Sequence, residues 1–123
     1  MVNFIAVFIG GGIGSIFRYL MSMVLFRFMP QFPLATLISN GLSSFIAGII
    51  IGLGMVRFEI SSSSRLFLIT GFCGGFSTFS TFSVETVHLF NSGKILPASA
   101  NVALNLFICF SLVMAGLAVT RKI

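Results

Sequence analysis

The segment from residue 71 to 83 reads Gly-Phe-Cys-Gly-Gly-Phe-Ser-Thr-Phe-Ser-Thr-Phe-Ser and concentrates glycines and hydroxyls in one place. Adjacent glycines weaken a helix, and Ser and Thr side chains can bond to the backbone groups that a break exposes. Unwound carbonyls of this kind coordinate small cations in membrane proteins. The segment therefore predicts a broken helix whose backbone oxygens are free to hold a cation.

Two phenylalanines in this segment predict a site for an anion. Phe79 and Phe82 are three residues apart and can share one helix face. An aromatic ring has a positive edge, so rings turned edge-on to a narrow path can contact an anion without a fixed charge. Ser80 and Thr81 between the rings, and the amide of Asn40, would supply ordinary hydrogen-bond donors. Such a path suits a small anion.

Two other segments carry polar side chains at helical spacing, so that each set lies on one helix face. The sets are Asn40, Ser43 and Ser44 in the first segment, and Asn101, Asn105 and Cys109 in the second. Inside a membrane, such groups either hydrogen-bond to a neighbouring helix or line a polar path, and the pattern leaves both open for any single residue. Two sets together favour a path.

Groups that could perform catalysis are scarce in the chain. The only histidine is His88, the only acids are Glu59 and Glu85, and no Asp is present to orient a base. Cys73 and Cys109 lack metal-ligand or redox spacing. We therefore expect a protein that is not an enzyme.

The composition predicts the elements that must position these groups. The chain has 123 residues, of which 57% are hydrophobic and 7% charged, and its mean hydropathy is +1.14. A chain this short cannot bury so much apolar area within itself. Residues 1–123 therefore predict one all-α domain embedded in membrane lipid. The net charge of +5 comes from dispersed cations, which form no basic patch and exclude nucleic acid as a partner.

Four uncharged runs, at residues 1–17, 28–56, 66–84 and 95–120, predict four transmembrane helices with short connections. The first and third runs must be extended to span a bilayer, past Arg18 and toward Glu85 respectively, so two of the spans contain an ionisable residue. Small residues four positions apart let helix backbones approach closely in lipid. Three glycine pairs have this spacing: Gly10 and Gly14, Gly48 and Gly52, Gly71 and Gly75.

The distribution of positive charge gives the chain almost no preferred orientation. In this topology, four cations lie on one side of the membrane and two on the other, or three if the side chain of Arg18 extends toward the first connection. They are Arg57, Arg65, Arg121 and Lys122 against Arg18, Arg27 and Lys94. Because Lys and Arg near the spans set orientation, a difference this small predicts insertion in both directions. Two copies in opposite orientations would form an antiparallel homodimer.

Three motifs carry a resemblance to a known family over essentially the whole chain. They are Gly-Gly-Gly-Ile-Gly-Ser-Ile-Phe-Arg-Tyr at residues 10–19, the segment 33–48 beginning Pro-Leu-Ala-Thr-Leu-Ile-Ser-Asn-Gly, and residues 71–83 with their Phe-Ser-Thr-Phe core. Together they resemble the CrcB family of small fluoride channels, also called Fluc. The resemblance implies an antiparallel dual-topology homodimer with two pores in the bacterial plasma (inner) membrane, exporting fluoride passively and excluding chloride.

The resemblance also implies roles for particular residues. Asn40 matches the pore asparagine, and Phe79 and Phe82 match the pair whose ring edges line the pores. The polar track of the third span would include Ser80 and Thr81, with Glu85 near its end, while Asn101 and Asn105 fall where the family places pore-facing polar groups.

The family further binds a structural, untransported sodium ion at the dimer centre, through backbone carbonyls that match Gly74 and Ser77. The family usually has Thr where this chain has Ser77, but a carbonyl ligand survives a change of side chain. Arg18 matches an arginine of the family's first span, for which we expect a structural or vestibular role.

Two other functions fit a short four-helix membrane protein. A small multidrug exporter relies on a glutamate in its first span, where this chain has Arg18 and no acid. A noncatalytic membrane scaffold would use the glycine pairs and polar residues for packing alone. No titratable relay runs along the predicted path, so passive flow is the simpler mechanism for a channel.

Overall fold

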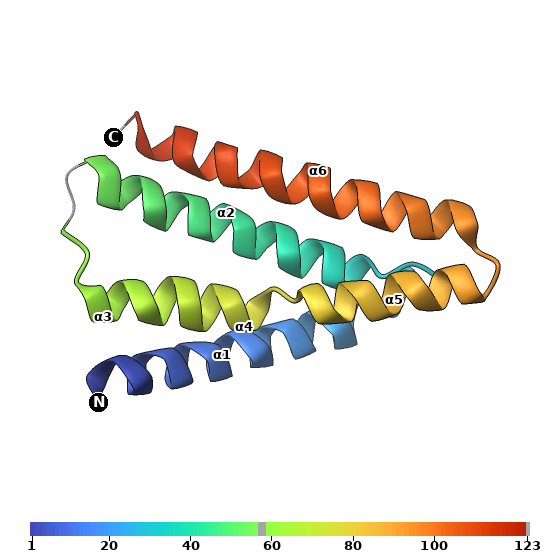
Figure 1. Cartoon of the computed structure of the whole chain (residues 1–123), viewed down its shortest axis with the longest axis horizontal. Helices are drawn as coiled ribbons and strands as arrows, with labels where there is room; N and C mark the ends of the chain where they lie inside the picture. The colour runs from blue at the N-terminus through green and yellow to red at the C-terminus, as the bar shows by residue number, and fades with distance from the viewer. Residues whose placement is uncertain (57–58, 123) are drawn as a thin grey trace.

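The computed structural model describes residues 1–56 and 59–122, and all the regular structure within them is helical (Figure 1). The elements are α1 (Val2–Leu25), α2 (Leu34–Val56), α3 (Ser62–Arg65), the π-helical η1 (Leu66–Cys73), α4 (Gly74–Phe76), α5 (Phe79–Asn91) and α6 (Ile95–Thr120). The elements from α3 to α5 follow one another along a single span. The four-helix architecture predicted from the sequence is confirmed.

Four helical segments are long and apolar enough to cross a membrane. They are Val2–Leu25, Leu34–Met55, Ser62–Asn91 and Ile95–Thr120. Each has at least the roughly 20 residues that a bilayer core requires. The N-terminus, the end of α2, the start of α3 and the end of α6 lie at one end of the bundle, and the α1–α2 and α5–α6 connections lie at the opposite end (Figure 1).

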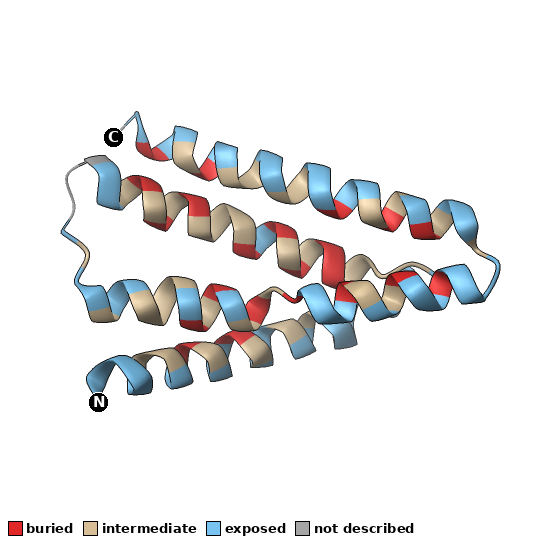
Figure 2. Ribbon diagram, in the orientation of Figure 1, coloured by how far each residue is buried: buried red, intermediate tan, exposed pale blue. Residues whose placement is uncertain are grey.

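The outer surface of the bundle is apolar, and the buried residues lie on the faces that the helices turn toward one another (Figure 2). Phe8 on α1 is 82% exposed and Phe107 on α6 is 73% exposed. Such a surface is not expected in contact with water, because large contiguous apolar patches are rare on soluble proteins. The chain is therefore a multi-pass membrane protein, as its composition predicts.

The third span is broken at the point where glycines and hydroxyls predict a break. Helix α4 ends at Phe76, Ser77 and Thr78 have extended backbones, and α5 begins at Phe79. The Thr78 side chain caps α5 by accepting the backbone N–H of Thr81 at 3.2 Å. The π-helical turns of η1 before the break are a feature that the sequence pattern does not predict.

Glycines bring the helix backbones into contact, which confirms the packing predicted for the pairs except at Gly52, which lies against the Thr120 side chain. A Cβ at Gly48 of α2 would collide with the Val113 carbonyl oxygen of α6, and one at Gly14 of α1 would collide with the Phe72 carbonyl oxygen of η1. Accordingly, α2 packs mainly on α6 and α1 packs mainly on η1. The span that carries the break is thereby held between α1 and α2.

The charged ends of the bundle agree with the topology assumed for the charge count. Arg65 ends α3, and Arg121 and Lys122 follow α6, at the end of the bundle that carries the N-terminus. Arg27 follows α1 and Lys94 precedes α6 at the other end. Arg57, the fourth cation counted on the first side, lies outside the described residues.

Candidate functional site

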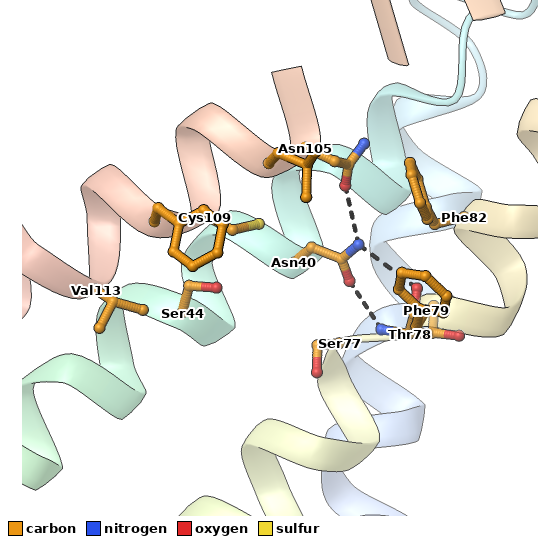
Figure 3. Close-up of a pocket in the computed structure, with 11 residues that line it drawn as sticks. Asn40, Ser44, Ser77, Thr78, Phe79, Phe82, Asn105, Cys109 and Val113 are labelled. Carbon is orange, nitrogen blue, oxygen red and sulfur yellow. Dashed lines mark hydrogen bonds between the residues drawn. The ribbon is translucent and has the colours of Figure 1, made fainter. Parts of the chain in front are cut away.

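A groove of about 320 Å³ opens between α2, α5 and α6 beside the break in the third span (Figure 3). We call it the Asn40 groove. Its lining comprises Asn40, Ser44, Ser77, Thr78, Phe79, Phe82, Asn105, Leu106, Cys109, Phe110 and Val113. The groove brings together six residues that sequence patterns assign to a polar or anion path: Asn40, Ser44, Phe79, Phe82, Asn105 and Cys109.

Asn40 replaces the helical partner that Thr78 loses at the break. Its Oδ1 accepts the backbone N–H of Thr78 at 2.8 Å, and its Nδ2 donates to Oδ1 of Asn105 at 3.0 Å. The second contact of Nδ2, to the Thr78 carbonyl oxygen, is 3.5 Å long. Hydrogen bonds at this distance are weak. Asn40 therefore keeps one weakly engaged amide hydrogen beside the groove.

The two phenylalanines lie side by side at the start of α5. The ring centroids of Phe79 and Phe82 are 5.4 Å apart and their planes are inclined by 51°. Phe82 is 8% exposed, whereas Phe79 is 77% exposed and lies at the open side of the groove. The break places both rings here, because α5 starts at Phe79 and not earlier.

A chain of buried hydrogen bonds leads from the groove into the bundle. Asn105, on α6, donates from Nδ2 to Oδ1 of Asn101 at 3.0 Å. Asn101 donates from Nδ2 to the Thr86 hydroxyl at 2.9 Å, and that hydroxyl donates to the Phe82 carbonyl oxygen at 2.7 Å. Asn105 lines the groove, whereas Asn101 is fully buried behind it.

Ser80 and Thr81 lie outside the lining of the Asn40 groove. Both are exposed on the first turn of α5. Their hydroxyls lie 3.2 Å and 3.1 Å from Oγ1 of Thr78. The hydroxyls of Thr78, Ser80 and Thr81 therefore form a small polar cluster next to the break in the third span.

Glu85 lies at a second cavity, of about 210 Å³, which shares no lining residue with the Asn40 groove. The Thr36 hydroxyl of α2 donates to its Oε1 at 2.8 Å. Its Oε2 is buried without a hydrogen-bond partner in the described part of the chain. His88, one turn further along α5, lines the same cavity. Arg18 is half-buried on α1 and lines neither cavity.

The break frees the backbone carbonyls of Gly74 and Ser77. In a continuous helix these oxygens would accept the N–H groups of Thr78 and Thr81. Here the Thr78 N–H donates to Asn40, and the Thr81 N–H donates to the Thr78 hydroxyl. Both oxygens are thus available as hard ligands, which fits a small alkali cation.

Three threonines with clear structural roles were missed by sequence reasoning. Thr78 caps α5 and donates its backbone N–H to Asn40. Thr86 accepts a hydrogen bond from the Asn101 amide, and Thr36 donates one to Glu85. A helical-spacing signal exists for two of them, because Thr36 lies four residues before Asn40 and Thr86 lies four residues after Phe82. Ser43 bonds between helices, donating to the Cys73 carbonyl at 2.8 Å.

The fold and this site define a small helical membrane protein whose groove has mainly apolar walls and a few hydrogen-bonding groups, among them Asn40 and Asn105. Residues 5–117 match a family described as CrcB-like protein, Camphor Resistance (CrcB). The chain belongs to this family, as its motifs indicate.

Relatives of the chain are named as channels. The chain is 47% identical over 114 residues to a protein of Pyrococcus abyssi, with 93% of this chain and 92% of the relative covered. It is 40% identical over 124 residues to a protein of Agrobacterium fabrum, with 100% and 99% covered. A protein of Serratia proteamaculans is 44% identical over 116 residues, with 94% and 90% covered. Each is named fluoride-specific ion channel FluC.

Proposed function

We propose that this protein is a fluoride-selective channel through which fluoride leaves the cell passively. The observation that carries the proposal is the Asn40 groove, where an incompletely engaged amide hydrogen lies beside the Phe79 and Phe82 rings. The names of full-length relatives support fluoride as the ion. The protein acts in the cell membrane and is not an enzyme.

Selectivity follows from the kinds of donor in the groove. Fluoride is small and strongly hydrated, so a pore must replace its lost water with close donors. The Asn40 amide gives up only a 3.5 Å contact when it turns to an anion. The positive edges of Phe79 and Phe82 add attraction without a fixed charge that would trap the ion. The proposal requires the assembled pore to be too narrow for the larger halides.

A second copy of the chain completes the pore in this proposal. The outer wall of the groove is open, since Phe79 is 77% exposed, Phe110 71% and Leu106 50%. Acyl chains cannot satisfy the Asn40 amide, because an unsatisfied polar group in hydrocarbon costs several kcal/mol. An antiparallel partner would cover the groove, and the almost even charge count permits both orientations. Symmetry then produces two equivalent pores.

The freed carbonyls of Gly74 and Ser77 would hold a structural sodium ion between the two copies. Bound there, the ion would stabilise the break by neutralising the partial charges of these oxygens. The chain itself contributes the extended backbone at Ser77 and the capping of α5 by Thr78, which keep the two carbonyls free.

Sodium dependence tests this part of the proposal. Replacing sodium by N-methylglucamine should lower both the fluoride flux and the thermal stability of the purified protein, because a ligand of the folded state stabilises it. Restoring sodium should reverse both changes. Equal flux and equal melting temperature in the two salts would contradict the sodium site.

The transport proposal is tested by efflux from liposomes. Vesicles with the purified protein should release fluoride on addition of a potassium ionophore, and should release chloride no faster than empty vesicles. Phe79→Ala should slow fluoride efflux by at least about tenfold, or ~1.4 kcal/mol. Phe8→Ala is the matched control, since Phe8 is similarly exposed but lies on α1, outside the groove. Fluoride efflux no faster than from empty vesicles would overturn the proposal.

A further inference from the structure

The hydrogen bonds between the asparagines run in one direction. Starting from the Thr78 N–H, each group accepts from the one before it and donates to the next. The order is Thr78, Asn40, Asn105, Asn101, Thr86 and finally the Phe82 carbonyl oxygen. We call this chain the amide relay. It begins at Thr78, the residue before Phe79, and ends at the backbone carbonyl of Phe82, so both of its ends lie on the third span.

The two ends of the relay fix this direction. A backbone N–H such as that of Thr78 can only donate, so Asn40 must turn its oxygen toward it. At the other end, the Thr86 hydroxyl proton is engaged with the Phe82 carbonyl at 2.7 Å, so its oxygen accepts from Asn101. Turning the amides over would place two donors face to face at Thr78. The relay therefore holds Nδ2 of Asn40, and not its Oδ1, toward Asn105.

We propose that Thr86 and Asn101, which do not line the groove, are positioning residues that hold the Asn40 amide with its hydrogens available to the anion. Asn101 is 0% exposed and Thr86 7%. The inference rests on the proposed function, because it assigns these residues a role in fluoride conduction. Bonds within such chains also polarise one another, so that Asn40 is a better donor when the whole relay is intact.

Loss of the Thr86 hydroxyl would disturb Asn40 from a distance. A buried Asn101 N–H without an acceptor would leave its present position, because an unsatisfied buried donor is costly. Asn105 would then keep only its bond to the Asn101 backbone carbonyl, at 3.0 Å, and its Oδ1 would no longer be fixed against Asn40. The Asn40 oxygen would stay on the Thr78 N–H, but its Nδ2 would lose a fixed acceptor on α6, so its hydrogens would no longer be held in one position beside Phe79.

The test compares Thr86→Val, which keeps the shape and removes the hydroxyl, with Thr86→Ser, which keeps the hydroxyl. Fluoride efflux should fall by about tenfold in Thr86→Val and should be largely restored in Thr86→Ser. The side-chain amide resonance of Asn40, in ¹⁵N-labelled protein, should move in Thr86→Val and stay in place in Thr86→Ser. A role in packing alone would leave that resonance unmoved.

A double variant covers the case in which Thr86→Val does not fold. Thr86→Val with Asn101→Leu removes both partners together, which is far less damaging than leaving one unpaired. It ends the relay at Asn105, so we expect the same loss of about tenfold in flux.

The inference is overturned if the double variant conducts like the natural protein, or if Thr86→Ser is as slow as Thr86→Val. Failure of the proposed function is distinguishable, since in that case the natural protein itself would release no fluoride.

Discussion

At the scale of single residues, the side chain of Asn40 takes the place of a missing backbone partner. Its oxygen accepts the Thr78 N–H and its nitrogen donates toward α6. The sequence predicts that Asn40 and Asn105 share a polar region, because both lie on polar helix faces. It does not predict that they bond to one another, since residues 65 positions apart meet only through the packing of α2 on α6.

Cys109 provides a chemical probe of the groove. It lines the groove and is partly exposed, whereas Cys73 is buried. An anionic methanethiosulfonate reagent should therefore attach to Cys109, fill part of the groove and reduce fluoride efflux by at least about tenfold.

Single substitutions identify the thiol responsible. Efflux through Cys109→Ser should be insensitive to the reagent, while Cys73→Ser should remain sensitive. If efflux became insensitive to the reagent in Cys73→Ser and stayed sensitive in Cys109→Ser, the Asn40 groove would not be on the conduction path.

At the scale of elements, the broken third span organises the site. The Gly-rich and hydroxyl-rich composition of residues 71–83 predicts the break, and the structure places it at Ser77 and Thr78. Composition alone does not predict the π-helical η1, which packs against α1. The exact start of α5 matters most, since it decides which phenylalanines face the groove.

The contact between α2 and α6 depends on the absence of a side chain at Gly48. Gly48→Ala would push a methyl group against the Val113 carbonyl oxygen, so the helices must separate. We expect a loss of about 1–3 kcal/mol in stability, as is typical of overpacking. The loss can be measured by heating samples of the purified protein to a series of temperatures and following the remaining folded protein by size-exclusion chromatography. The melting temperature should be lower for Gly48→Ala than for the natural protein.

Gly54→Ala is the matched control on the same helix. A Cβ at Gly54 meets nothing within 4 Å, and alanine favours a helix more than glycine does. An equal loss of stability in Gly54→Ala and Gly48→Ala would mean that backbone contact is not what holds α2 to α6.

At the scale of the whole molecule, the sequence predicts four spans in a membrane, and the structure agrees. Composition suffices for this because the bilayer fixes both the length and the polarity of each span. The spans of a single chain do not predict how two copies would be oriented relative to each other. The proposal that two copies pair in opposite orientations rests on the charge balance and on the open wall of the Asn40 groove.

Added charge should separate the two orientations. Phe28→Lys with Asn91→Lys raises the positive charge at the Arg27 and Lys94 end of the bundle, which should favour insertion with that end in the cytoplasm. A tag at the C-terminus should then become accessible from one side only, and fluoride efflux should fall because antiparallel pairs no longer form.

Mixing restores the missing orientation. Co-expression with a variant biased the other way, Arg27→Ser with Lys94→Ser, should recover efflux. Full efflux from the first variant alone, in one orientation, would contradict the antiparallel pore.

The most direct test of selective, passive fluoride conduction is the reversal potential across a planar bilayer that contains the purified protein. With a tenfold fluoride gradient and an opposing chloride gradient, we predict a reversal potential near the fluoride equilibrium value of about 59 mV in magnitude, unchanged by pH on either side. A reversal potential that follows chloride or the cation, or that shifts with a proton gradient, would contradict the account.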